Sequence, residues 1–143
     1  MGEPIKVKIK KLKPSASIPK KATDGSAGFD LTVNNIMYDS KYGVWEYGCG
    51  LAFEIPKGYA GLLFMRSSVY KTGHSMKNAV GVIDCDFTGE IKAIFSDKDS
   101  PGYIPGDRFA QLVITPIPEV EFEEVSELSE TERGSGGFGS TGQ

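Results

Sequence analysis

The sequence predicts an all-β protein, built as a sandwich, jelly roll or small barrel of short strands. Apolar residues recur at every second position, as in Phe29 to Val33 and Ile91 to Phe95, which is the period of a strand. Turn-forming residues recur at short intervals, and glycine alone accounts for 18 of the 143 residues. No long stretch keeps a 3.6-residue apolar stripe, so at most one helical turn is expected, after Ser67.

The first predicted strand is Ile5 to Ile9, in which apolar residues alternate with lysines. The basic cluster Lys6 to Lys13 is interpreted as the solvated face of an edge strand, because lysine protects sheet edges from pairing with other chains. A nucleic-acid-binding arm is the alternative. The net charge of −3 argues against it, so no nucleic-acid partner is expected.

The remaining strands are predicted from apolar runs and from the turn signals between them. Several of these runs are almost continuously apolar, which is typical of strands buried on both faces. The runs are Phe29–Val33, Leu51–Ile55, Ala60–Met65, Glu90–Phe95 and Phe109–Ile117. The turn signals are Asp24-Gly25, Ser40–Gly43, Pro56–Gly58, Thr88-Gly89, Ser100–Gly102 and Pro105–Asp107.

Between the predicted strands Phe29–Val33 and Leu51–Ile55, the segment Asn34 to Gly50 is rich in aromatic residues. It is interpreted as a surface hairpin, with Trp45 at a contact between subunits.

The chain is expected to divide into a β domain, residues 1–132, and a flexible glycine-rich tail, residues 133–143. The end of the domain, Glu119 to Glu132, carries seven glutamates, with Val120 and Phe122 as strand-like anchors. The tail has the composition of a linker, yet it contains an arginine and a phenylalanine that linkers seldom need.

Cysteine and histidine are too few for a disulfide scaffold or an ordinary zinc site: the chain has Cys49, Cys85 and His74. His74 is expected to be a loop or interface residue, and Tyr103 a packing or interface residue. No apolar run is long enough for a membrane span, and no signal-peptide core is seen, so no membrane partner is expected. The expected location is the cytoplasm, or the interior or nucleus of a host cell if the protein is viral.

Only three of the 16 cationic residues are arginines: Arg66, Arg108 and Arg133. Each lies in a turn-like context rich in small or polar residues, where a planar guanidinium beside backbone N–H groups could grip phosphate. The alternative is that one or more only pair with an aspartate, and for Arg108, next to Asp107, the two interpretations are balanced. A bound polyphosphate would bring Mg²⁺, which binds mainly to phosphates.

The stretch Asn78 to Glu90 predicts strand, turn, strand, with Asp84 directly after an apolar run. A carboxylate fixed there and partly desolvated suits a general base that orients a water molecule. The backbone of such a hairpin can also pair with a nucleobase edge. On the residues alone, the simpler interpretation of Asp84 and Asp86 as ordinary turn acids is favoured.

Five stretches, taken together and in order, resemble the five motifs of the trimeric dUTPase family, and the resemblance covers roughly residues 18–143. The stretches are Ala22–Leu31, Arg66–Ser68, Gly81–Ile91, Gly106–Leu112 and Arg133–Gly142. The resemblance implies a distorted β jelly roll that assembles as a homotrimer, with active sites shared between subunits and closed by the tail. It also implies Mg²⁺-assisted attack of water on the α-phosphate of dUTP, giving dUMP and pyrophosphate. This activity would limit uracil incorporation into DNA and supply dUMP for thymidylate synthesis.

The resemblance also assigns roles to individual residues. Asp84 would be the catalytic carboxylate, and Asp30 would order the site and its metal-bound waters. Uracil would be recognised by Asn78, Lys92 and the backbone of Val82 and Ile83. The phosphates would be held by Arg66, Ser67, Ser68 and Gln111. From the tail, Arg133 would reach the γ-phosphate and Phe138, followed by Gly139, would stack on uracil. Arg108 and Asp107 would give structural support.

Two departures from the family pattern stand out. Phe87 occupies the usual place of a tyrosine whose ring packs under the deoxyribose, and Cys49-Gly50-Leu51 stands where Thr-Gly-Leu is common. Two other functions stay open: a deaminase of dCTP with the same fold, and a regulatory protein that binds a partner. The tail and the lack of a glutamate-containing stretch before Asp84 argue against the deaminase, and only Asn34–Gly50 favours the partner-binding role.

Overall fold

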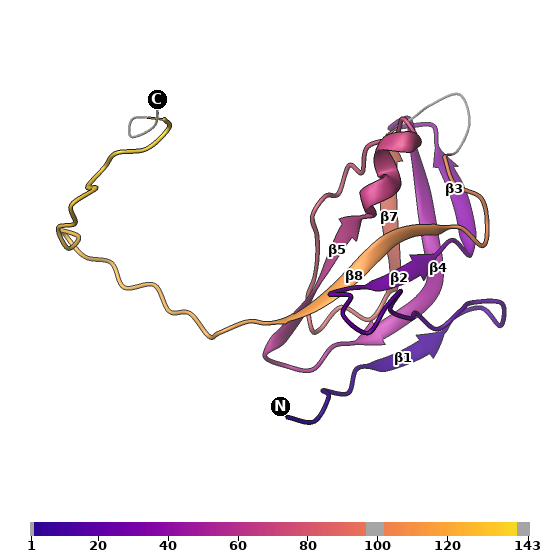
Figure 1. Ribbon diagram of the computed structural model, residues 1–143, viewed down its shortest axis with the longest axis horizontal. Helices are drawn as coiled ribbons and strands as arrows, with labels where there is room; N and C mark the ends of the chain where they lie inside the picture. Colours follow the sequence, from indigo (N-terminus) through magenta and orange to yellow (C-terminus); the bar gives the residue numbers. More distant parts are fainter. Residues whose placement is uncertain (1, 97–101, 140–143) are drawn as a thin grey trace.

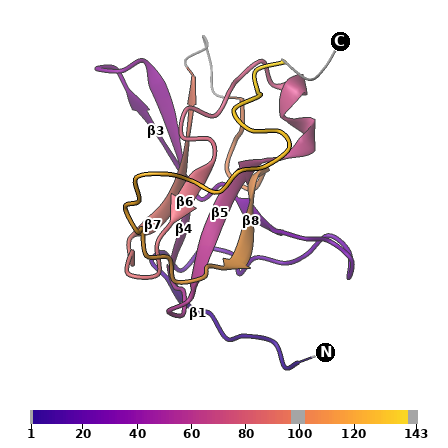
Figure 2. The same cartoon turned by 90° about the vertical axis from the view of Figure 1, so that its left-hand side faces the viewer.

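The computed structural model, described for residues 2–96 and 102–139, is a jelly-roll sandwich of two antiparallel sheets (Figure 1 and Figure 2). The first sheet contains β1 (Lys8–Lys11), β3 (Asn35–Asp39), β4 (Val44–Glu54) and β7 (Glu90–Ser96). The second has the order β2 (Phe29–Thr32), β8 (Arg108–Pro116), β5 (Tyr59–Met65) and β6 (Gly81–Ile83). One 3-10 turn, η1 (Ser67–Lys71), follows β5. The predicted all-β class and the single helical turn after β5 are therefore confirmed.

Strand β4 is the central strand of the first sheet. Its first half pairs with β3 on one edge and with β7 on the other, and its second half pairs with β1. Among the described strands, β1 pairs with β4 alone, and its lysines are exposed, which confirms the predicted lysine-rich edge strand, although the strand begins at Lys8 and not at Ile5. In the described part of the chain, no helix is long and apolar enough to span a bilayer.

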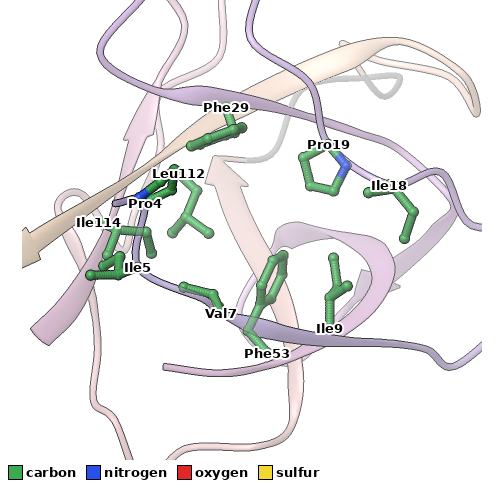
Figure 3. A pocket seen from close by; sticks show the side chains of 10 residues that line it. All are labelled: Pro4, Ile5, Val7, Ile9, Ile18, Pro19, Phe29, Phe53, Leu112 and Ile114. Atoms are coloured by element: carbon green, nitrogen blue, oxygen red, sulfur yellow. The ribbon is translucent and has the colours of Figure 1, made fainter. Parts of the chain in front are cut away.

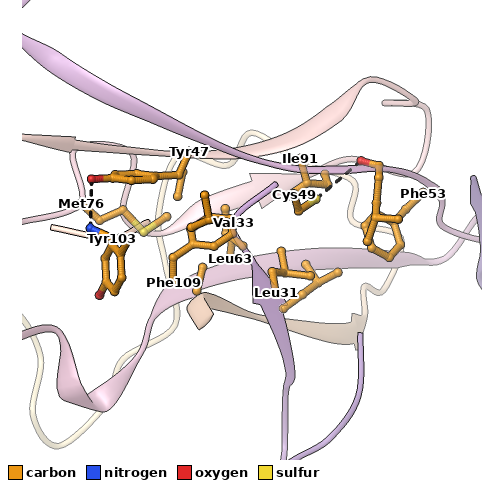
Figure 4. Close-up of a cluster of buried hydrophobic side chains, with 14 of the residues drawn as sticks. Leu31, Val33, Tyr47, Cys49, Phe53, Leu63, Met76, Ile91, Tyr103 and Phe109 are labelled. Atoms are coloured by element: carbon orange, nitrogen blue, oxygen red, sulfur yellow. Dashed lines mark hydrogen bonds between the residues drawn. The ribbon is translucent and has the colours of Figure 1, made fainter. Parts of the chain in front are cut away.

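The core lies between the two sheets and is built mainly from the inward positions of each strand (Figure 4). In β7 the buried residues Ile91, Ala93 and Phe95 alternate with half-buried ones, as the period-two pattern predicted. Tyr47 lies at the centre of an aromatic group, edge-on to Phe95 at 5.4 Å and to Tyr103 at 5.6 Å between ring centroids. Its hydroxyl accepts hydrogen bonds from two backbone N–H groups, which ties the loop before β8 to the core.

The segment Asn34–Gly50 forms a hairpin, as predicted, but the prediction that it lies on the surface was wrong for its second half. Tyr47 and Cys49 are buried, because this part of β4 is paired on both edges and covered by the second sheet. The tip is open, with Tyr42 68% exposed, and Met37 and Tyr38 of β3 are exposed as well. The Trp45 ring lies 4.8 Å from that of Tyr38 at an interplanar angle of 54°, and its contact with another subunit stays a prediction.

A β-bulge interrupts β4 between Gly48 and Ala52, and Glu90 holds it in place. Gly50 has a φ of +72°, which glycine adopts without steric cost. The Glu90 carboxylate accepts a hydrogen bond of 2.7 Å from the Gly50 N–H and one of 2.8 Å from the Asn35 side chain. A side chain at Gly48 would overlap with this carboxylate. Glu90 therefore ties β3, β4 and β7 together at the base of the β6–β7 hairpin.

Beyond β8 the chain leaves the sandwich as an extended segment, residues 117–132, which we call the arm (Figure 1). Val120 and Phe122, predicted as strand-like anchors, form no strand, and Phe122 is 96% exposed. These residues form no strand because a strand needs a partner edge, and the arm pairs with none of the described strands.

The buried thiol of Cys49 predicts a loss of stability at high pH. Burial raises its pKa to about 11 from the ordinary 9.0. Between these pH values the Cys49 thiol loses its proton in the unfolded chain but keeps it in the folded chain. The free energy of unfolding is therefore unaffected by this thiol well below pH 9 and falls as pH rises toward 11. We expect the free energy of unfolding, measured with urea, to fall by about 1 kcal/mol more between pH 9 and 10 than it does in a Cys49→Ala variant.

Cys85→Ala is the matched control, because it removes a thiol that is only partly buried. It should keep the full dependence on pH. An equal pH dependence in the wild type and in Cys49→Ala would contradict this account.

Candidate functional site

Two arginines converge on one aspartate at the outer side of the second sheet. The Arg66 Nε lies 3.6 Å from one carboxylate oxygen of Asp30, and an Arg108 guanidinium nitrogen lies 3.5 Å from the other. The Asp30 side chain is only 18% exposed. Of the two interpretations of Arg108, pairing with an aspartate is therefore confirmed, but the partner is Asp30 and not the adjacent Asp107. Asp107 instead accepts a hydrogen bond from the backbone N–H of Ile104 and closes the turn before β8.

Strand register brings this arginine–aspartate cluster together. Gln111 of β8 lies opposite Asp30 of β2 on one side and opposite Phe64 of β5 on the other, so residues distant in sequence become neighbours. The Gln111 side chain donates to the Met65 carbonyl at 3.2 Å, just before Arg66.

The serines that follow β5 complete the same surface. Arg66 also donates to the hydroxyl of Ser68 at 3.3 Å, while Ser67 is exposed at the start of η1. Two guanidinium groups, two hydroxyls and an amide thus face one surface, which suits a polyanion.

Asp84 lies at a different place, at the end of β6. It begins a tight turn in which the Phe87 N–H donates to the Asp84 carbonyl at 3.1 Å. Asp84 borders an open hollow of about 590 Å³, whose other lining residues include Lys57, Tyr59 and Glu119. The expected partial desolvation of Asp84 was wrong for the single chain: the residue is exposed, because β6 is an edge strand with nothing beyond it.

The residues expected to recognise a base lie on and beside the β6–β7 hairpin. Val82 is 63% exposed, and within residues 2–96 and 102–139 β6 pairs with β5 alone, so its outer edge is open there for pairing. Ile83, next along this edge, is half-buried. The Lys92 ammonium instead lies 3.8 Å from the Glu46 carboxylate.

Asn78 already uses its amide within the chain. Its oxygen accepts from the Ile94 N–H at 3.0 Å, and its nitrogen donates to the Lys92 carbonyl at 3.3 Å. Asn78 therefore fastens the segment before β6 to β7, and one amide hydrogen is left for a ligand.

The two groups of site residues are separated by the length of β5. Ile83 pairs with Gly61, so Asp84 lies beside Ala60, whereas Arg66 comes six residues further along the chain. At a strand rise of about 3.3 Å per residue, the two ends are roughly 20 Å apart. One subunit therefore does not bring Asp84 and the arginine–aspartate cluster to the same ligand.

The tail carries the remaining predicted residues away from both groups (Figure 1). Arg133 donates to the carbonyl of Gly136, which closes a turn within the tail. Phe138 is fully exposed, with a φ of 56°, and Gly139 follows it with a φ of 85°. Residues 140–143, the end of the fifth motif, lie outside the described residues.

In the described residues, no group of three or more His, Cys, Asp or Glu side chains could hold a metal ion. The carboxylate expected near a metal, Asp30, faces a guanidinium with each oxygen, at distances that still leave lone pairs for water. This donor set fits a cation carried by the phosphates of a ligand better than one caged by the protein.

Two further residues lie at these places although they were not predicted as site residues. Lys57, in the turn between β4 and β5, borders the hollow next to Asp84. Glu90 fixes the base of the hairpin that carries Asp84. Lys57 stands in a predicted turn and Glu90 in the third motif-like stretch, but neither pattern indicates which group the side chain contacts.

A second hollow is almost wholly apolar and has a volume of about 430 Å³ (Figure 3). It lies between the β1 segment and the second sheet, and it is lined by Pro4, Ile5, Val7, Ile9, Ile18, Pro19, Phe29, Phe53, Leu112 and Ile114. We call it the apolar groove.

Comparison with known proteins gives a consistent result. The family model for dUTPase matches residues 14–142. The deoxyuridine 5'-triphosphate nucleotidohydrolase of Nautilia profundicola is 43% identical, with 97% of this chain and 100% of that protein covered. The enzyme of that name from Helicobacter pylori is 42% identical, with 96% and 97% covered. The dUTPase of Staphylococcus bacteriophage 80alpha, solved with dUPNHPP, has a TM-score of 0.81 and 28% identity, over 96% of this chain and 99% of that one.

The two hydrogen bonds from the Asn78 side chain to β7 predict that substitution of Asn78 exposes the Ile94 amide to exchange. Asn78→Ala removes the acceptor of the Ile94 N–H, so we expect hydrogen exchange at that amide, measured by NMR, to speed up about tenfold. Asn78→Asp keeps an oxygen acceptor and should protect Ile94 while losing only the bond to the Lys92 carbonyl. Unchanged exchange in Asn78→Ala would show that the Asn78 side chain does not protect the Ile94 amide.

Proposed function

This chain belongs to the dUTPase family, and we infer from its site that it hydrolyses dUTP to dUMP and pyrophosphate. The observation that carries the proposal is the presence of all the required groups on defined elements. Asp84 lies at an exposed turn, Arg66 and Ser67 lie in a separate anion-binding cluster, and Arg133 and Phe138 lie on a detached tail.

A complete site then needs more than one subunit. The roughly 20 Å between Asp84 and Arg66 along β5 is far longer than a triphosphate chain. We propose that Asp84 of one copy faces the arginine–aspartate cluster of the next, and that three copies close into a ring with threefold symmetry.

The arm supplies the third contribution. Five of its apolar residues are between 48% and 96% exposed in the single chain: Ile117, Val120, Phe122, Val125 and Leu128. The apolar groove offers cover on a second copy, and β1 beside it is an edge strand with exposed lysines, whereas the arm carries seven glutamates. Apolar contact and opposite charge therefore both favour docking of the arm on a neighbour, which would carry Arg133 and Phe138 to a shared site.

The chemistry follows from these positions. The Asp84 carboxylate accepts a proton from a water molecule, whose oxygen attacks the α-phosphorus, and pyrophosphate leaves. Arg66, Ser67, Ser68 and Gln111 hold the phosphates, and Arg133 from the tail meets the charge on the γ-phosphate. Closure of the tail over the ligand excludes bulk water and aligns the attack.

A Mg²⁺ ion bound to the substrate phosphates fits the donor set, and when bound it would neutralise part of their charge. Asp30 is placed to order the waters around such an ion while it positions Arg66 and Arg108. This proposal uses no protein cage, in keeping with the absence of a metal-binding group among the described residues.

Base and sugar would be recognised at the β6–β7 hairpin. The open edge of β6 at Val82 and Ile83 can pair with uracil as with a further strand, and Asn78 has one free amide hydrogen for the base. Lys92 forms an ion pair with Glu46, and it would contribute to the recognition of uracil from its position on β7. The ring of Phe87 would pack under the deoxyribose, and Phe138 would stack on uracil from the other side.

The proposal is tested by offering the purified protein dUTP, dTTP, dCTP and UTP with Mg²⁺ and measuring both pyrophosphate and ammonia. We expect pyrophosphate from dUTP and no ammonia from dCTP. Ammonia from dCTP would instead identify a deaminase, and no reaction with any of the four would overturn the proposed function.

Replacement of the general base gives a sharper result. Asp84→Asn keeps the shape of the side chain but removes the proton acceptor, so we expect kcat for dUTP to fall by about 10³-fold or more while KM changes little. The mass in solution and the binding of a non-hydrolysable dUTP analogue should stay as in the wild type. Turnover at the wild-type rate would exclude Asp84 as the base.

Docking of the arm on a neighbour predicts that assembly of the trimer depends on the Phe122 side chain. Phe122→Asp places a charge where the arm needs an apolar contact, so we expect the trimer to dissociate and activity to be lost, as measured by sedimentation and pyrophosphate release. Tyr42→Asp, at the exposed tip of the β3–β4 hairpin, is the matched control and should stay trimeric. A trimeric, active Phe122→Asp variant would contradict docking of the arm.

A further inference from the structure

We propose that Gly89 is a specificity-determining position, because its missing side chain leaves the surface on which the Phe87 ring rests. The inference depends on the proposed role of Phe87 against the sugar and extends it to the residue beneath the ring. A Cβ added at Gly89 would lie 2.8 Å from the ring Cζ, 3.1 Å from Cε1 and 3.5 Å from Cε2. These three nearest atoms all belong to the Phe87 ring.

The backbone does not require glycine at this place. The φ of Gly89 lies outside the left-handed region, in contrast to Gly50, Gly58 and Gly106. An L-residue is therefore compatible with the local chain path, and the ring is the obstacle to it. Glycine is therefore needed at position 89 because the Phe87 ring lies against it, and not because of the backbone conformation.

The ring is partly open to solvent. Phe87 is 45% exposed, and it lies in the tight turn that begins at Asp84, where its N–H donates to the Asp84 carbonyl. A half-exposed aromatic side chain moves between rotamers unless something holds it. Contact with the flat face of Gly89 restricts the outer edge of the ring, which is the part that would meet a 2′-substituent of a nucleotide sugar.

A methyl group at Gly89 would push the ring off this surface and leave it mobile. The steric wall against a 2′-hydroxyl would then weaken, while Asp84, at the other end of the turn, keeps its backbone geometry. The expected effect is therefore on the choice of sugar and on KM, and not on the rate of the chemical step.

The test is a double-mutant cycle with dUTP and UTP as substrates of the full chain. Gly89→Ala should lower the ratio of kcat/KM for dUTP over UTP by about tenfold, with kcat for dUTP nearly unchanged. In a Phe87→Ala background, where no ring rests on position 89, the same substitution should leave the ratio unchanged, because the two effects share one contact. Gly2→Ala, where a Cβ meets no atom within 4 Å, is the control for a glycine-to-alanine change.

The possible outcomes separate the two proposals. If the wild type hydrolyses neither nucleotide, the proposed function fails. If the wild type prefers dUTP but Gly89→Ala has the wild-type ratio, or if the effects of the two substitutions simply add, only the role of Gly89 is overturned.

A folding defect in Gly89→Ala is covered by a second variant. Adding Phe87→Leu removes the outer ring edge and should restore the trimer, with the ratio of Phe87→Leu alone. A double variant that stays unfolded would place the need for glycine in the backbone and would overturn the inference.

Discussion

The length and stiffness of strand β5 is the constraint on which the organisation of this protein depends. The strand is hydrogen-bonded on both edges, to β8 and to β6, so it can neither bend nor shorten. It holds Asp84 beside its first residues and Arg66 after its last. The chemical groups of the proposed reaction are thereby fixed at a distance that no side-chain movement can close. The proposed site shared between copies rests on this separation, and so does the proposed reach of the tail between them.

The arginine–aspartate cluster suits the polyanion binding proposed for this acidic protein. With a net charge of −3, the chain has no general attraction for phosphate, so the proposed binding depends on local cations. Asp30 faces Arg66 with one oxygen and Arg108 with the other. This carboxylate keeps both guanidinium groups in place when no ligand is bound, so less ordering is needed when phosphates arrive. The same arrangement explains why arginine, and not lysine, occupies these positions, since a planar fork can meet a carboxylate and a phosphate at once.

The β6–β7 hairpin combines a rigid base with an open end. At its base, Glu90 bonds to Gly50 and Asn35, and Asn78 bonds to the backbone of β7 on both sides of Ala93. At its end, Asp84 and Phe87 stand at the two ends of one exposed turn. Fixed backbone with exposed side chains is the arrangement expected of a site that a second subunit and a nucleotide must cover.

The sequence by itself determined the all-β class, the lysine-guarded edge strand, the single turn of helix and, through its ordered motifs, the family; the roles of the site residues stay predictions. These features are local: strand period, turn residues and ordered motifs can be seen without knowing what lies across the sheet. It did not determine that Arg108 pairs with Asp30, that Tyr47 and Cys49 are buried, or that Asp84 is exposed and distant from Arg66. Each of these depends on strand register and on which strand lies at an edge, which are set by pairings between residues far apart in the chain. Only the tertiary structure decides them, because hydrogen bonding across a sheet leaves no local pattern in the residues that it brings together.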